Sequence, residues 1–185
     1  MNVSGDRVFE APRATVWQVL NDPESMAKTM PGVESFDVHD DRHWTANVKI
    51  PLGLGSMKMK VDMEKVEERE LDFANLAVKG QGVGAIMNME TSFTLSDADG
   101  GGTSMAWSAE VKVLGPVGSM GQRVLQPIVN QQVQHVLTAL DVQVQEAMAG
   151  DGAGPATHGA EEGISPGSPE AYEPDPEGPT TSTED

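Results

Sequence analysis

The clearest pattern along the chain is an alternation of apolar and polar residues. It is cleanest over residues 57–64, where Met57, Met59, Val61 and Met63 alternate with lysine and acidic residues. A period of two is typical of an antiparallel strand with one buried face and one solvated face. Weaker versions of the pattern, separated by Gly- and Asp-rich turns, predict six more strands. They are expected at residues 3–9, 33–39, 43–50, 71–79, 83–95 and 105–113.

Two short segments near the N-terminus and one long segment near residue 130 have helical spacing instead. Pro12 and Pro23 stand where first helical turns are expected, and Asp22 is a candidate N-cap for the second short helix. Steps of three and four between apolar residues predict a long amphipathic helix from Gly115 to about Met148. A helix of about 30 residues would be roughly 45 Å long, enough to cross a whole sheet.

The order of these elements predicts an α+β fold. A curved antiparallel sheet of about seven strands needs a cover for its apolar face, and only the long helix is large enough. A curved sheet that grips one helix leaves a cavity that suits an apolar ligand. Because strand side chains alternate, the apolar positions should point into that cavity. The predicted lining residues are Trp44, Val48, Met57, Met59, Met63, Val83, Met87, Met89, Met105, Trp107, Ala109, Met120, Val124 and Ile128.

Methionine is prominent in this set. All 11 methionines of the chain lie within residues 1–148. Met is unbranched and polarizable, so it adapts to irregular ligands, although an inward Met is also ordinary core. We therefore weigh two interpretations, a deformable lining for an isoprenoid or acyl chain and a simple packed interior.

Charge divides the chain in two. The formal net charge is −17, and residues 149–185 contain nine acids and no Lys or Arg. Subtraction leaves 20 acids and 12 bases in residues 1–148, a net charge of −8. Residues 149–185 are also rich in Gly and Pro. They have too few apolar side chains to bury, so burial cannot offset the conformational entropy lost when the segment becomes ordered. We expect a folded domain at 1–148 and a disordered acidic tail at 149–185, either solubilising or able to dock on a basic partner.

Composition excludes several classes of protein. The chain has no cysteine, which rules out disulfide scaffolds and cysteine-ligated metal sites. An acidic protein is unsuited to binding nucleic acid through a broad basic face. No apolar run reaches the length of a membrane span, and no secretory signal is visible. The expected location is cytoplasmic.

Candidate chemistry is sparse. His39 and His43 flank a turn with two aspartates, but they lack helical ligand spacing and a third ligand, so an exposed polar turn is favoured over a metal site. His135 has glutamine neighbours that indicate the solvent side. The segment Gly80–Gly84 resembles a phosphate loop, yet no helix follows it. We therefore expect no catalytic residue, no metal and no cofactor.

Three segments resemble one family. They are Phe9–Ser35 with its Asn-Asp-Pro-Glu and Pro-Gly elements, Gly100–Thr103, and Gly118–Leu125. Together they look like the carbon monoxide dehydrogenase G-subunit family, within the SRPBCC superfamily of helix-grip, START/Bet v 1-like folds. The resemblance covers about residues 1–145.

The resemblance implies an accessory protein of a molybdenum hydroxylase, with a quinone or lipid in the cavity. Some members are thought to tether the enzyme to the membrane through an apolar C-terminal segment; this chain has an acidic one. The implied location is cytoplasmic, peripheral to the inner face of the membrane through a partner. Two alternatives stay open: a cyclase or hydrolase of the same fold, which would need inward acids, His or Tyr, and an interaction module with a filled core. A cavity of about 300 Å³ or more would argue against the filled core.

Overall fold

The computed structural model describes residues 1–52 and 55–151. These residues form a seven-stranded antiparallel sheet in the order β1-β7-β6-β5-β4-β3-β2. From β2 to β7, each strand pairs antiparallel with the next strand along the chain. The last strand, β7, also pairs antiparallel with β1. The strands are β1 (Asn2–Phe9), β2 (Val33–Val38), β3 (His43–Leu52), β4 (Gly55–Arg69), β5 (Phe73–Gly82), β6 (Ala85–Asp97) and β7 (Thr103–Leu114). The predicted α+β helix-grip architecture is confirmed.

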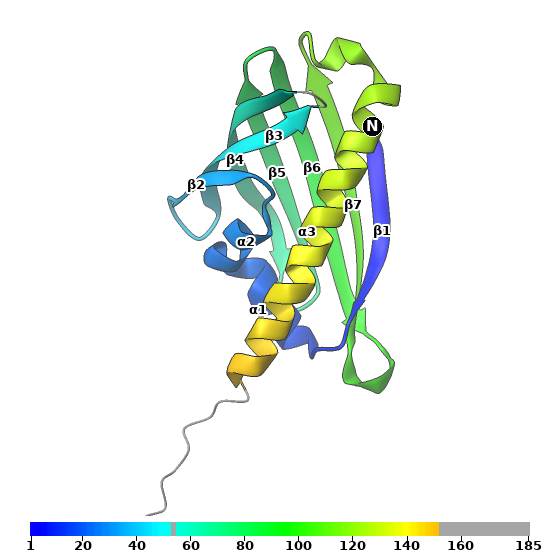
Figure 1. The fold of residues 1–185 in the computed structure, drawn as a ribbon. Coiled ribbons are helices and arrows are strands. Elements are labelled where there is room, and N and C mark those ends of the chain that lie inside the picture. The colour runs from blue at the N-terminus through cyan, green and yellow to red at the C-terminus, as the bar shows by residue number, and fades with distance from the viewer. Residues whose placement is uncertain (53–54, 152–185) are drawn as a thin grey trace, which may run out of the picture. The chain divides into compact units, whose positions relative to one another are not determined.

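A single long helix covers one face of this sheet. Helix α3 (Gln122–Asp151) crosses in front of the strands, and the two short helices α1 (Arg13–Asn21) and α2 (Pro23–Thr29) lie beside its C-terminal half (Figure 1). The bidentate ion pair between Arg7 of β1 and Asp141 of α3 ties the helix to the sheet edge. At the start of α2, the Asp22 carboxylate accepts a hydrogen bond from the Ser25 N–H at 2.8 Å, as the cap prediction requires.

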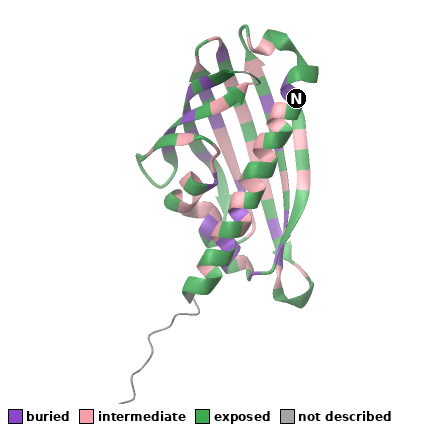
Figure 2. Cartoon of the chain, viewed as in Figure 1, coloured by how far each residue is buried: buried purple, intermediate pink, exposed green. Residues whose placement is uncertain are grey.

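The core divides into two clusters of buried apolar residues. One lies where α1 and the C-terminal half of α3 meet the sheet, and includes Val16, Leu95 and Leu140. The other lies on β3, β4 and β5, and includes Ala46, Met59 and Val78. Alternation of buried and exposed residues runs along the strands, and large parts of α3 are only half-buried (Figure 2). Cavity space, described below, separates the middle of α3 from the sheet.

The long helix departs from its prediction at both ends. The segment that begins at Gly115 is not α-helical. It contains a 3₁₀ turn, η2 (Gly118–Met120), and Gly121 then adopts a φ of +80°. This left-handed residue breaks the helical path, and α3 begins after it at Gln122. At the other end, α3 continues through Ala149 and Gly150 to Asp151, three residues past the expected boundary. A terminal turn tolerates glycine at a cost of about 1 kcal/mol. The rest of the predicted acidic tail, residues 152–185, lies outside the described residues.

Candidate ligand cavity

An apolar cavity of about 390 Å³ lies between the sheet and α3. Small-molecule sites typically measure about 300–1,000 Å³, so this space is large enough for a ligand. Its walls come from the inward positions of β3 to β7, the facing side of α3, and α2 with the Met30–Pro31 segment. From the predicted set, the residues that line it are Val48, Met57, Met59, Met63, Met87, Met89, Met105, Trp107, Ala109 and Ile128.

The other four predicted residues lie elsewhere. Trp44 is buried in the core, 7% exposed, and is not among the residues that line the cavity. Val83 is 94% exposed, because β5 ends at Gly82 and the expected strand position falls on the turn to β6. Met120 and Val124 are 48% and 43% exposed. The break at Gly121 explains the exposure of both residues. Met120 precedes α3, and because α3 starts only after Gly121, its first turn points Leu125 inward in place of Val124.

The sequence interpretation missed Gln132. Gln132 was not among the predicted lining residues, yet it lines the cavity. The spacing contained the signal, since Gln132 follows Ile128 by four residues and precedes Val136 by four. His135, three positions on, is exposed as expected. One face of α3 therefore carries a single polar residue among apolar ones.

Polar groups on the wall differ in whether they have a partner. The hydroxyls of Thr29 and Thr91 donate to backbone carbonyls, of Met26 at 2.8 Å and of Ser108 at 3.1 Å. In contrast, Gln132 Nε2 and Trp107 Nε1 are buried and have no hydrogen-bond partner within the described structure. None of the described lining residues is Asp, Glu, His, Lys, Arg or Tyr. The described wall thus has no ionisable group for proton transfer.

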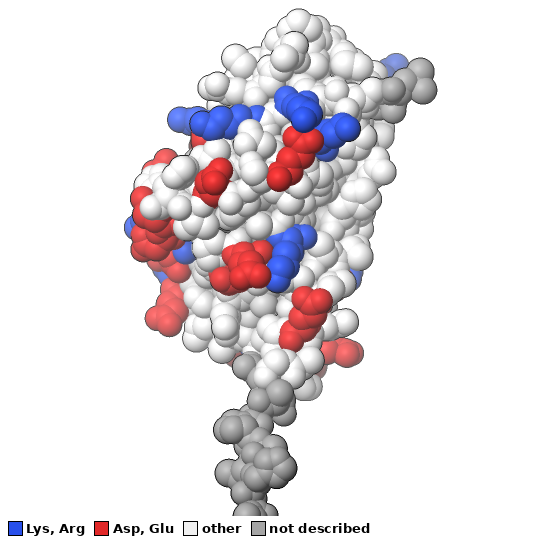
Figure 3. All heavy atoms as spheres, turned by 60° about the vertical axis from the view of Figure 1, so that its left-hand side comes forward, with Lys and Arg blue, Asp and Glu red and all other residues white. Residues whose placement is uncertain are grey.

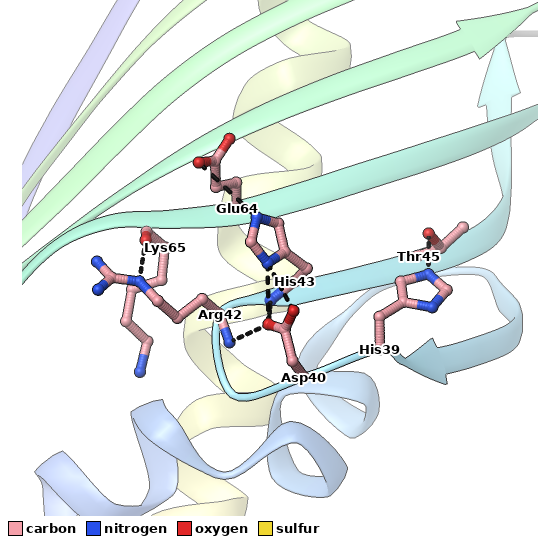
Figure 4. A network of polar contacts seen from close by, with 7 residues as sticks. All are labelled: His39, Asp40, Arg42, His43, Thr45, Glu64 and Lys65. Carbon is pink, nitrogen blue, oxygen red and sulfur yellow. Dashed lines mark hydrogen bonds and ion pairs between the residues drawn. The ribbon is translucent and has the colours of Figure 1, made fainter.

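The His39–His43 turn is a hydrogen-bonded surface turn (Figure 4). His43 Nδ1 lies 2.9 Å from Asp40 Oδ1, and His39 Nε2 lies 2.8 Å from the Thr45 hydroxyl. Hydrogen bonds from the Arg42 backbone N–H and from His43 lower the pKa of Asp40. Across residues 1–52 and 55–151, no three His, Asp or Glu side chains are grouped as metal ligands.

The glycines of Gly80–Gly84 have a packing role. A Cβ on Gly80 would lie 2.4 Å from the Met59 Sδ, and one on Gly82 would lie 2.7 Å from the Lys58 carbonyl oxygen. Glycine at these positions lets β4 and its methionines approach β5 closely. The resemblance to a phosphate loop therefore has a structural explanation in the strand pairing.

One end of the molecule combines exposed apolar residues with basic ones. At this end the Val117 N–H donates to the Gly84 carbonyl at 3.0 Å, and Val117 is also one of the residues that line the cavity. The uppermost surface in Figure 3 lacks charge and has Lys and Arg side chains below it, whereas acids dominate the lower part. The exposed apolar residues are Val83, Ile86, Leu114, Met120 and Val124. The basic residues of the adjoining segments are Lys49, Lys58, Lys60, Lys79, Lys112 and Arg123.

Comparison with known proteins identifies the family. The model of the carbon monoxide dehydrogenase G-subunit family (CoxG) matches residues 5–145. The chain belongs to this family. The predicted family resemblance is thereby confirmed over most of the chain, and it includes every residue that lines the cavity except Val3. Among curated proteins, no sequence matches significantly.

Solved structures confirm the fold of this CoxG family member. A conserved protein from Geobacillus kaustophilus is 20% identical, with a TM-score of 0.74, over 80% of this chain and 97% of that one. A START superfamily protein from Mycobacterium smegmatis is 16% identical, with a TM-score of 0.62, over 78% and 97%. The Zhui aromatase/cyclase from Streptomyces sp. R1128 is 15% identical, with a TM-score of 0.58, over 80% and 93%.

Proposed function

We propose that this protein binds a hydrophobic small molecule, a quinone or a lipid, without transforming it. The observation that carries the proposal is the cavity of about 390 Å³, whose wall is apolar except for a few hydroxyl, amide and indole groups. Eight methionines on that wall let it adapt to the shape of a flexible chain: Met26, Met30, Met57, Met59, Met63, Met87, Met89 and Met105. The volume also argues against an interaction module with a filled core.

The partner in this proposal is a molybdenum hydroxylase of the carbon monoxide dehydrogenase type, for which the chain is an accessory protein. Its support is the family to which residues 5–145 belong. The location we propose is cytoplasmic, peripheral to the inner face of the membrane through that partner. None of the described helices has an apolar stretch long enough to cross a bilayer. The exposed apolar residues and lysines at the Gly84–Val117 end fit contact with an anionic surface.

A cyclase of the same fold is the second candidate, because one structural neighbour is named an aromatase/cyclase. Such an enzyme needs a general acid or base within hydrogen-bond reach of its substrate. The described wall offers no ionisable side chain for that role. Binding without chemistry is therefore the better-supported function.

Native mass spectrometry of the full chain, followed by organic extraction and mass analysis of the extract, tests this proposal. We expect an added mass that solvent releases as an intact apolar molecule. Incubation with that molecule should return it unchanged, and a conversion product would favour the cyclase. An interior that takes up neither extracted lipids nor quinones would contradict ligand binding altogether.

A further inference from the structure

We infer that Met87 and Met89 of β6 make ligand binding sensitive to peroxide, because oxidation of their thioethers to sulfoxides lowers the affinity of the cavity for an apolar molecule. The inference rests on the proposed function and adds a chemical means of regulating it. Methionine is the only sulfur-containing residue of this chain, which has 11 methionines and no cysteine. Peroxide therefore meets no thiol here, and the thioethers are the sulfur groups that it can oxidise.

Met87 and Met89 keep accessible surface on the inward face of the sheet. The register places Met89 between Val78 of β5 and Val111 of β7, and Met87 lies two residues earlier on the same face. Both valines line the cavity, as do the two methionines. Met87 and Met89 are half-buried, and on this face the accessible surface of a side chain borders the cavity.

The other methionines of the sheet are more tightly packed. Met57, Met59, Met63 and Met105 also line the cavity, but all four are buried, and Met59 is only 3% exposed. A Cβ at Gly80 would collide with the Met59 sulfur, so this thioether packs directly against the backbone of β5. The methionines of the sheet therefore differ in accessibility, and those of β6 are the more open to a small reagent.

Hydrogen peroxide is small enough to reach these two residues. The cavity of about 390 Å³ has room for water-sized molecules and is not closed off from its surroundings. In the reaction the O–O bond of the peroxide breaks and one of its oxygens forms an S=O bond, so the sulfur is oxidised by two electrons and water leaves. The product is a polar group on a wall that is otherwise mostly apolar.

A sulfoxide on this wall weakens ligand binding more than it weakens the fold. Water that enters the ligand-free cavity solvates the S=O oxygen. An apolar ligand displaces that water and leaves the oxygen without a donor, a cost that corresponds to a loss of affinity of about tenfold or more. The described wall has no Lys, Arg or His to replace the water, and the hydroxyls of Thr29 and Thr91 already donate to backbone carbonyls.

The order of oxidation tests the accessibility that the inference needs. The delipidated full chain is treated with hydrogen peroxide, quenched with catalase at intervals and analysed by peptide mass mapping. We expect sulfoxides first at the exposed Met120 and Met148, then at Met87 and Met89, and last at the buried Met59. Oxidation of Met59 as fast as Met87 and Met89 would overturn the inference.

A bound ligand should protect the two residues of β6. The protecting molecule is 1-dodecanol, added at a concentration that displaces a neutral fluorescent dye, N-phenyl-1-naphthylamine, from the cavity. We expect the alcohol to slow oxidation of Met87 and Met89 severalfold and to leave Met120 and Met148 unaffected, because those two lie outside the cavity wall. Unchanged rates at Met87 and Met89 would show that the cavity is not the route of attack, which would overturn the inference.

Leucine variants assign the loss of affinity to these positions. Leu conserves the volume of Met and cannot form a sulfoxide. Met87→Leu/Met89→Leu should bind the dye like the wild type before treatment. After treatment and removal of peroxide, the wild type should lose about tenfold or more in affinity, whereas this variant should stay within about twofold. Met120→Leu/Met148→Leu is the matched control and should lose affinity as the wild type does.

Failure of the inference and failure of the proposed function give different results. If the untreated wild type binds no dye, the proposed function fails, and the loss of affinity fails with it. If it binds the dye and keeps its affinity with sulfoxides mapped at Met87 and Met89, only the inference fails. Equal losses in the wild type and in Met87→Leu/Met89→Leu would also overturn it. So would a large fall in the thermal midpoint of the oxidised wild type, since affinity would then be lost through unfolding.

Discussion

Lys65 Nζ lies 2.7 Å from Oδ1 of Asn21, which joins the inward row of β4 to the end of α1. The row runs through Met57, Met59, Val61 and Met63, and the next inward residue is this lysine, 7% exposed. Its ammonium also lies 3.0 Å from Glu68 and 5.8 Å from the centre of the Trp44 ring. The apolar wall of the sheet therefore ends at a fixed cation that anchors a short helix.

Replacing this lysine tests how much the anchor contributes. Lys65→Met keeps an apolar stem of similar length but leaves the Asn21 amide oxygen without its donor. We expect a loss of about 1–3 kcal/mol in the free energy of unfolding, measured with urea. Lys60→Met is the control, since Lys60 is exposed and its contact with Asp62 is 3.6 Å, so its loss should stay below about 1 kcal/mol. Equal effects of the two variants would contradict the anchoring role.

Substitutions that fill the cavity distinguish a ligand-binding site from a fully packed hydrophobic core. Met89 and Ala109 both line the cavity, on β6 and β7. Met89→Trp and Ala109→Phe should abolish binding of a fluorescent fatty acid or quinone analogue while the unfolding free energy changes little. If the interior has no spare volume in solution, the same variants should instead lose about 1–3 kcal/mol through overpacking.

The Asp22 cap should make the α1–α2 corner sensitive to acid. Burial alone would raise the pKa of Asp22, but the hydrogen bonds from Ser25 and Glu24 and the attraction of Lys28 outweigh it and lower the pKa. A lowered folded pKa means that the charged cap stabilises the fold above the pKa of the unfolded chain. That contribution is lost as the pH falls through the folded pKa.

Two variants measure this cap. Asp22→Ala should cost about 1 kcal/mol at neutral pH, because the Ser25 N–H loses its acceptor. Asp22→Asn keeps a capping oxygen that does not titrate. The stability difference between wild type and Asp22→Asn, from thermal unfolding, should therefore shrink in acid; a difference constant with pH would show that the titrating cap is not involved.

We propose that residues 1–151 fold without the acidic segment that follows. Among residues 122–150, whose burial the structure describes, Val144 is the last buried residue of α3 and Ala147 the last that packs on the core. A chain that ends at Asp151 should keep the thermal midpoint of the full chain within a few degrees. One that ends at Leu137 loses the buried Leu140 and Val144 and should unfold far more easily. A large drop for the first truncation would mean that residues 152–185 contribute to stability.

The sequence predicted the sheet well because burial on one face imposes a period of two, which Met57 to Met63 follow without interruption. It was wrong about Val83, because the same period continues by chance into a turn. Met120 and Val124 were misplaced because the φ of Gly121, which sets the phase of α3, is not visible in apolar spacing. Gln132 was not predicted to line the cavity because the predicted lining set was built from apolar positions. Its place on the wall follows from the phase of α3, which begins at Gln122.

The pairing of β1 with β7 has a consequence for how the chain folds. Asn2 lies opposite Glu110, and the N-terminal amine donates to the Val111 carbonyl at 2.6 Å. Segments separated by more than 100 residues must meet before this sheet edge forms, and such high contact order slows folding. During synthesis, β1 leaves the ribosome well before β7, the strand with which it pairs. The meander from β2 to β6 can pair in order of synthesis, so closure of the β1–β7 edge and docking of α3 are expected to be the late events.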